Sequence, residues 1–125
     1  MERNKKVLVV DDDAHVRRVL QVKLKSQGYE VIMARDGEEG LQMINEEKPD
    51  AVITDINMPK LDGEALAKQS NELKKERPFL TIVMTARISP QEQKWVDQMQ
   101  DTQLMQKPFS PNMMLKALNN YFGKD

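Results

Sequence analysis

The stretch KVLVVDDD, residues 6–13, decides the fold, because a continuous apolar run leads directly into three carboxylates. Three further short runs also end in a polar side chain: residues 51–54 before Asp55, residues 80–84 before Thr85, and residues 104–106 before Lys107. Continuous runs rich in Val and Ile are typical of strands that are buried on both faces, as in parallel sheets. If these strands are neighbours, their polar ends meet at the edge where open α/β sheets bind ligands.

Helical patterns separate the apolar runs, and residues 29–34 form a fifth run. We expect helices over residues 14–27, from Asp36 to before Pro49, over about residues 64–77, from Ser89 and from Ser110. The signals are Asp caps, a Gly stop at Gly28 and a Ser89-Pro90-Gln91-Glu92 capping box. Five strands alternating with five helices predict an α/β fold with a parallel sheet and helices on both faces.

Composition narrows the class of protein. The chain has 125 residues, with 19 Lys and Arg against 20 Asp and Glu and no Cys. We expect one domain over residues 1–125, with its core at about residues 6–122 and no output domain after the last helix. The chain lacks the excess of basic residues that is typical of proteins that bind nucleic acids directly. No apolar run approaches the ~20 residues that a membrane span requires. Nor does the N-terminus carry a secretory signal, so we expect a soluble cytoplasmic protein.

Carboxylates gathered at one sheet edge repel each other. At ~4 Å and an effective dielectric constant of about 20, each pair costs on the order of 4 kcal/mol. A hard divalent cation such as Mg²⁺, which prefers oxygen ligands, would relieve this repulsion. We therefore expect Asp11 and Asp12 to be metal ligands, although one Asp could simply cap the next helix, a role that suits Asp13 best.

The other strand-end residues each allow two interpretations. Asp55 could be a nucleophile that forms an aspartyl phosphate, or an ordinary turn residue. Thr85 could donate a hydrogen bond to an anionic oxygen, or could be only a β-branched strand residue. Lys107 offers a compact charge for a phosphate oxygen, or is a solvated surface lysine. Together with the acidic residues, the set favours phosphate chemistry.

Four motifs occur in order along the chain: VLVVDDD, ITDINMPKLDG, MTA and KPFS, which begin at Val7, Ile53, Met84 and Lys107. In this order the chain resembles the receiver (CheY-like) domain of two-component response regulators, and the resemblance extends from about residue 6 to residue 122. It implies a flavodoxin-like, doubly wound (βα)5 fold with strand order 2-1-3-4-5.

The resemblance also implies roles. Asp55 would be the phosphoacceptor and, with Asp11, Asp12 and the backbone carbonyl of Asn57, would form the Mg²⁺ site. Thr85 and Lys107 would contact the phosphoryl group. The donor would be a sensor histidine kinase or a histidine phosphotransfer protein, and an unknown downstream protein would receive the signal. The chain would be a phosphoacceptor and not an enzyme, either monomeric or weakly dimeric on phosphorylation.

The chain departs from the family pattern at the expected signalling face. Leu104 stands where the family often has a switch aromatic, and Gln100-Asp101 replaces the usual Gly-Ala pair. We expect Thr85 still to move on phosphorylation, without a ring-type switch at Leu104. Arg87 lies near the site and could shield an acyl phosphate from water, although a solvated arginine is an equally simple interpretation.

Two alternatives remain open. A receiver-shaped adaptor could act by docking alone, without phosphate. A haloacid-dehalogenase-type phosphatase also uses a strand-end Asp-x-Asp, here Asp11 and Asp13, but the other residues that it requires are absent. The one histidine, His15, is expected on the surface, because a lone imidazole makes no catalytic set.

Overall fold

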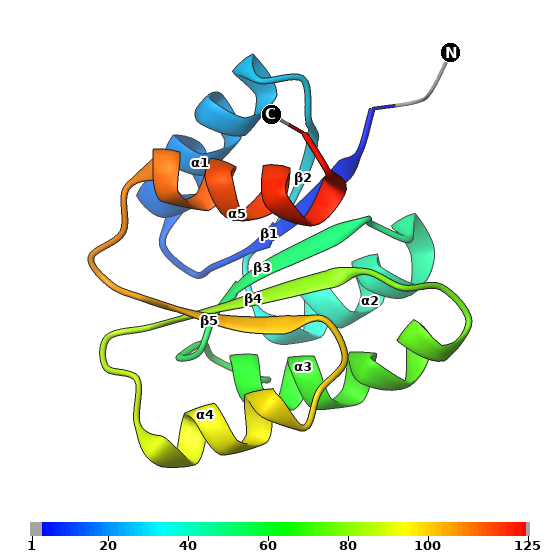
Figure 1. Cartoon of the computed structure of the whole chain (residues 1–125), viewed down its shortest axis with the longest axis vertical. Helices are drawn as coiled ribbons and strands as arrows, with labels where there is room; N and C mark the ends of the chain where they lie inside the picture. The colour runs from blue at the N-terminus through cyan, green and yellow to red at the C-terminus, as the bar shows by residue number, and fades with distance from the viewer. Residues whose placement is uncertain (1–3, 125) are drawn as a thin grey trace.

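A computed structural model describes residues 4–124 of the chain. One parallel five-stranded sheet forms the centre, in the order β2-β1-β3-β4-β5 (Figure 1). The strands are β1 (Lys6–Val10), β2 (Glu30–Ala34), β3 (Ala51–Asp55), β4 (Leu80–Thr85) and β5 (Thr102–Gln106). The expected α/β class and strand order are confirmed.

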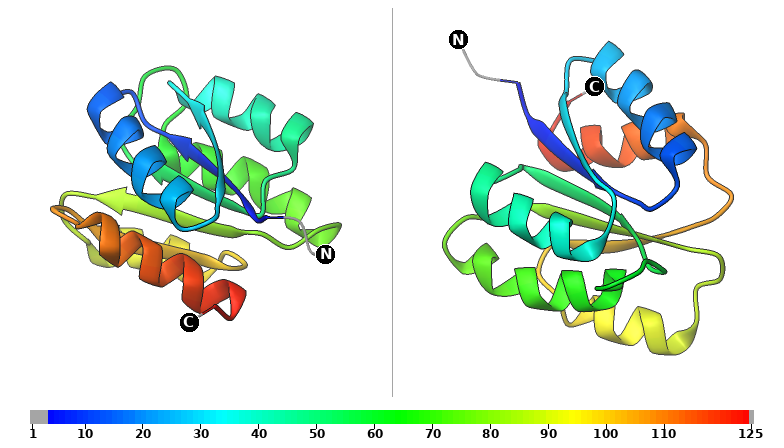
Figure 2. Two further views of the ribbon diagram at one scale, coloured as in Figure 1. Left: turned by 90° about the horizontal axis from the view of Figure 1, so that it is seen from above. Right: turned by 180° about the vertical axis from the view of Figure 1, so that it is seen from behind.

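Helices cover both faces of the sheet. They are α1 (Ala14–Ser26), α2 (Gly37–Glu47), α3 (Gly63–Asn71), α4 (Pro90–Asp97) and α5 (Pro111–Phe122). The α1 and α5 helices lie side by side on one face, and α2, α3 and α4 lie on the other (Figures 1 and 2). Right-handed crossovers between parallel strands produce this doubly wound arrangement.

Alternation along β1 shows why residues 7–10 are all apolar. Val7 and Val9 belong to the core beneath α1 and α5, whereas Leu8 and Val10 pack on the α2 and α3 side. All four side chains are 0% exposed. Strand positions that are buried on both faces are mostly apolar, which is the pattern of residues 7–10.

The helix starts agree with the sequence signals. Asp13 and Asp36 cap α1 and α2, and Ser89 with Glu92 forms a reciprocal capping box at α4. The expected single helix over residues 64–77 is wrong in its last part. The α-helix ends at Asn71, and the chain continues as a 3-10 helix, η1 (Glu72–Lys75).

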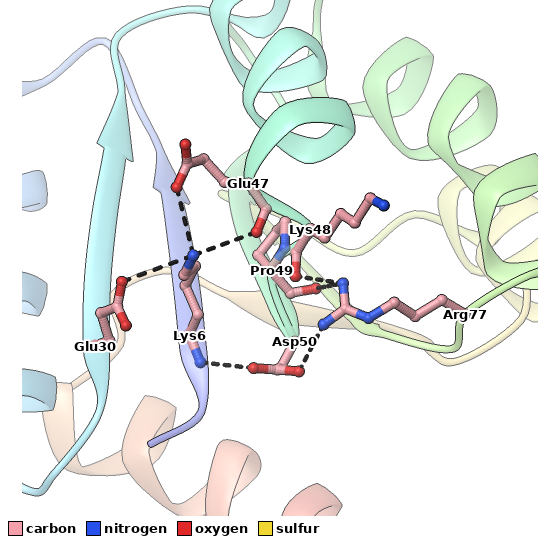
Figure 3. Close-up of polar contacts among 7 residues, drawn as sticks. All are labelled: Lys6, Glu30, Glu47, Lys48, Pro49, Asp50 and Arg77. Atoms are coloured by element: carbon pink, nitrogen blue, oxygen red, sulfur yellow. Dashed lines mark hydrogen bonds and ion pairs between the residues drawn. The ribbon is translucent and has the colours of Figure 1, made fainter. Parts of the chain in front are cut away.

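An ion-pair network joins the amino ends of the central strands, at the edge opposite the acidic residues (Figure 3). The Asp50 carboxylate accepts a hydrogen bond from the backbone N–H of Lys6 at 2.7 Å and pairs with Arg77 at 2.8 Å. The Lys6 ammonium pairs with Glu47 at 3.4 Å and with Glu30 at 3.7 Å. These contacts connect β1, β2 and α2 to the segment that precedes β4, at the amino ends of the strands.

None of the helices described between residues 4 and 124 is both long enough and apolar enough to cross a membrane.

Candidate functional site

Three carboxylates meet at the carboxyl edge of the sheet. Asp11 and Asp12 follow β1, and Asp55 is the last residue of β3, the strand paired with β1. One carboxylate oxygen from each of the three lies within 4.8 Å of the others. Asp11 is 1% exposed and Asp55 7%, whereas Asp12 is exposed. The sheet therefore brings together three residues that the sequence placed at two separate strand ends.

Asp11 is the most deeply buried of the three carboxylates. Its Oδ1 accepts a hydrogen bond from the Asp13 backbone N–H at 2.9 Å, while its Oδ2 is buried without a hydrogen-bond partner in the described part of the chain. Burial raises the pKa of Asp11 to about 6, and the nearby charges of Asp55 and Asp12 add to the rise against the opposing effects of the Asp13 N–H and Lys107. A buried, unpartnered oxygen is costly, so this atom is suited to a cation.

Lys107 supplies a positive charge at the same edge. Its Nζ lies 2.9 Å from Asp55 Oδ1 as an ion pair, without the angles of a hydrogen bond. The Lys107 backbone N–H donates to the Thr85 carbonyl at 2.7 Å, which joins the ends of β4 and β5. One ammonium against three carboxylates leaves the cluster with a net negative charge, so the site retains an attraction for a cation.

The Thr85 hydroxyl contacts acceptors at the start of α4, and its contact with a phosphoryl group stays a prediction. Thr85 ends β4 and is 3% exposed. Its Oγ1 lies 3.2 Å from Glu92 Oε1 and 3.1 Å from the Arg87 carbonyl oxygen. Within residues 4–124 the hydroxyl makes no hydrogen bond to Asp55 or Lys107, so in this state it is engaged at the start of α4.

The loop after β3 closes tightly on Asp55. The Gly63 N–H donates to the Ile56 carbonyl at 2.9 Å, and a Cβ at Gly63 would lie only 2.3 Å from the Asp55 carbonyl oxygen. The Thr54 hydroxyl donates to the same Asp55 oxygen at 3.0 Å. Asn57 is exposed in this loop, and the role of its carbonyl as a metal ligand stays a prediction. Only glycine fits at position 63, because the backbone approaches too closely for a side chain.

Of the other candidates, His15 and Arg87 are exposed. Leu104 is partly buried and packs against the cluster that contains Val83, Trp95 and Val96. Sequence reasoning identified Glu92 as part of a capping box but missed its contact with Thr85. Nothing local signals that contact, because the two residues lie seven positions apart in different elements.

Sequence reasoning also missed the role of Arg17, whose guanidinium donates a hydrogen bond from α1 to the Asp11 carbonyl oxygen at 2.7 Å. That bond links the first turns of α1 to the acidic end of β1.

Comparison with known proteins adds the family. A family model described as the response regulator receiver domain matches residues 7–119. The alkaline phosphatase synthesis transcriptional regulatory protein PhoP of Bacillus subtilis is 40% identical over 118 residues, which are 92% of this chain and 48% of that protein. The chain spans about half the length of PhoP and 33% of a probable transcriptional regulator, ycf27, of Guillardia theta.

Solved structures agree with the sequence relatives. The chemotaxis protein CheY4 of Vibrio cholerae has a TM-score of 0.84–0.85 and 31% identity, with 94% of this chain and 98% of that chain covered. A putative response regulator from Chloroflexus aurantiacus has a TM-score of 0.84 and 30% identity, with 98% and 100% covered. Fold, motif order and sequence relatives thus agree, and the chain belongs to the family of response regulator receiver domains.

Proposed function

We propose that Asp55 accepts a phosphoryl group from a phosphohistidine on a sensor histidine kinase or a phosphotransfer protein. The observation that carries the proposal is that Asp55 belongs both to the acidic cluster and to the ion pair with Lys107. A carboxylate in such a place is a nucleophile with a cationic neighbour for the oxygens of an incoming phosphoryl group.

In the proposed step, an Asp55 carboxylate oxygen forms a bond to phosphorus as the bond from phosphorus to the donor imidazole nitrogen breaks. The electron pair of that broken bond goes to the imidazole, and the product is an acyl phosphate. The Lys107 ammonium holds one phosphoryl oxygen, and the Thr85 hydroxyl turns to donate to another. These residues position the group and neutralise charge, which is most of what phosphoryl transfer requires.

The acidic residues fit Mg²⁺. Asp11, Asp12 and Asp55 offer the hard oxygen ligands that Mg²⁺ prefers. The buried Asp11 Oδ2 has no hydrogen-bond partner among the described residues, so binding a cation would compensate its burial. Asn57 would add its backbone carbonyl. When bound, Mg²⁺ supplies positive charge that offsets the repulsion among the carboxylates and the phosphoryl oxygens.

The remaining roles follow from this chemistry. The described elements act as one receiver domain, whose own Asp55 is phosphorylated. The domain is a phosphoacceptor and does not act as an enzyme on a separate substrate. A downstream protein, not a nucleic acid or a membrane, reads the modified state, with the chain monomeric or weakly dimeric. The proposal places the chain in the cytoplasm, where ATP feeds the donor kinase. Family membership removes the phosphatase interpretation.

The test is reaction with acetyl phosphate and Mg²⁺, followed by intact-mass measurement. We expect the parent to gain the mass of one phosphoryl group and Asp55→Asn to gain none. Asp97→Asn, which changes an exposed carboxylate on α4, is the matched control and should react like the parent. A parent that stays unmodified would contradict the proposal and would favour a docking module that works without phosphate.

A further inference from the structure

Glu92 forms a polar link between Thr85, at the end of β4, and helix α4, and it is the basis of an inference that rests on the proposed function. We propose that Glu92 is a positioning residue, which holds the Thr85 hydroxyl at the start of α4 until a phosphoryl group on Asp55 competes for it. Phosphorylation would then release Glu92 and change the N-terminal cap of α4.

The geometry around the hydroxyl defines the competition. Thr85 Oγ1 lies 3.2 Å and 3.5 Å from the two Glu92 carboxylate oxygens and 3.1 Å from the Arg87 carbonyl oxygen. A hydroxyl has one proton, so it donates to one acceptor at a time. The carboxylate is charged and is therefore the stronger acceptor, while the carbonyl is a fallback at similar distance.

Glu92 also belongs to the cap of α4. The Ser89 hydroxyl accepts from the Glu92 N–H at 3.0 Å, and the Glu92 carboxylate accepts from the Ser89 N–H at 3.4 Å. The second of these bonds is long, so Thr85 is a substantial part of what holds the carboxylate in place. When Thr85 turns away, the carboxylate is held only by its cap contact, and the first turn of α4 loses a tie to β4.

Residue 104 offers no comparable connection. Leu104 has neither a hydroxyl nor a ring, and it packs partly buried against Val83, Trp95 and Val96. Trp95 lies on α4 one turn after Glu92, is 6% exposed and is the one tryptophan in the chain. A change at the start of α4 is therefore placed where a native fluorophore can report it.

The magnitude follows from the competition. The part-buried Glu92 carboxylate binds the Thr85 hydroxyl, but the Arg87 carbonyl can replace it as an acceptor. The hydrogen bond therefore favours the state in which Thr85 contacts Glu92 by about three- to tenfold. A ligand that needs the released state binds more weakly by that same factor. Removing Glu92 should remove this penalty and tighten the binding of a phosphoryl mimic, whereas loss of a cap that served only the helix would not.

The experiment titrates beryllofluoride in the presence of Mg²⁺ and follows Trp95 fluorescence. The variants are Glu92→Ala and Glu92→Gln, each also made in a Thr85→Val background. Glu39→Ala is the matched control. Glu39 occupies the same third position of α2, and its carboxylate accepts from the Arg35 backbone N–H at 2.8 Å without a link to Thr85.

We expect Glu92→Ala to bind beryllofluoride about three- to tenfold more tightly than the parent, since the charged competitor is gone. Glu92→Gln keeps the shape with a neutral acceptor and should shift affinity less in the same direction. In the Thr85→Val background the Glu92 effect should vanish, and Glu39→Ala should bind like the parent. If the effect of Glu92 on beryllofluoride affinity is lost in the Thr85→Val background, Glu92 acts through the Thr85 hydroxyl. A residue that served only as a helix cap would have the same effect in both backgrounds.

Two outcomes overturn the inference. In the first, Glu92→Ala and Glu92→Gln bind beryllofluoride no more tightly than the parent. In the second, the Glu92 substitutions tighten binding equally in the Thr85→Val background. Failure of the proposed function has a different signature, in which the parent binds beryllofluoride no better than Asp55→Asn. Thermal unfolding of each variant verifies that it is folded, and Glu92→Gln keeps the test available if the alanine variant is not.

Discussion

Asp11→Asn should stabilise the protein at neutral pH in the absence of Mg²⁺, although it removes a proposed metal ligand. Asp11 is 1% exposed, and its Oδ2 has no hydrogen-bond partner in the described chain. The Asn oxygen can still accept from the Asp13 N–H, and the new amide N–H group can donate toward the neighbouring carboxylates. The variant thus removes a buried charge and keeps the local shape.

The size of the effect comes from the pKa of Asp11, which burial raises from 3.8 to about 6 in the folded protein. A raised pKa means that the folded state binds more protons than the unfolded state between these values, so the free energy of unfolding falls as pH rises from about 4 to about 6. Roughly two pKa units correspond to about 3 kcal/mol. Above pH 6 the penalty is constant, and below pH 4 it is absent.

The assay is urea unfolding of parent and Asp11→Asn between pH 4 and pH 8. We expect Asp11→Asn to be more stable by about 3 kcal/mol at pH 7 and equal to the parent at pH 4, with unchanged slopes. Mg²⁺ should stabilise the parent more than the variant and close the gap, since the ion binds only the folded state.

Asp12→Asn is the matched control, because it makes the same exchange at the adjacent exposed position, where no buried charge is removed, and should change the free energy of unfolding much less. A stability difference for Asp11→Asn that is the same at pH 4 and pH 7 would refute the reasoning, since it would show that the carboxyl charge is not the source of the cost.

Gly63→Ala should lower the free energy of unfolding by about 2 kcal/mol or more, because the new Cβ would lie 2.3 Å from the Asp55 carbonyl oxygen and 2.8 Å from the Ile56 Cα. Urea unfolding measures this loss of stability, and an unchanged unfolding midpoint would mean that the loop moves aside freely. Lys74 is 2% exposed and donates to Asp101 and Thr102 at 3.2 and 3.1 Å. Burial lowers the pKa of Lys74 from 10.5 to about 8, so the unfolded state binds more protons between these values and the stability of the parent should rise with pH in that window, by up to about 3 kcal/mol relative to Lys74→Met. Parallel pH profiles for the two proteins would contradict this account of Lys74.

Much of the fold could be predicted because its signals are local. The apolar run before Asp11 predicts a strand buried on both faces, and the side chains of β1 pack into cores on both sides of the sheet. Caps such as Asp13 and the Ser89 box need only neighbouring residues, and they lie as predicted. The sequence pattern does not predict where α3 ends, at Asn71. In the 3-10 helix that follows, Lys74 turns inward to acceptors on Asp101 and on Thr102, the first residue of β5, a contact across more than twenty residues that no local pattern reveals.

The sequence by itself determined the periodicity of the elements and the polar side chain at the end of each strand, and this is why the acidic edge and the receiver motifs could be recognised. Only the tertiary structure decided that Asp11 is buried and Asp12 exposed, and that Thr85 is held by Glu92. The physical reason is that a side chain's direction and charge state depend on burial and on acceptors contributed by other elements. Those partners are set when the chain packs.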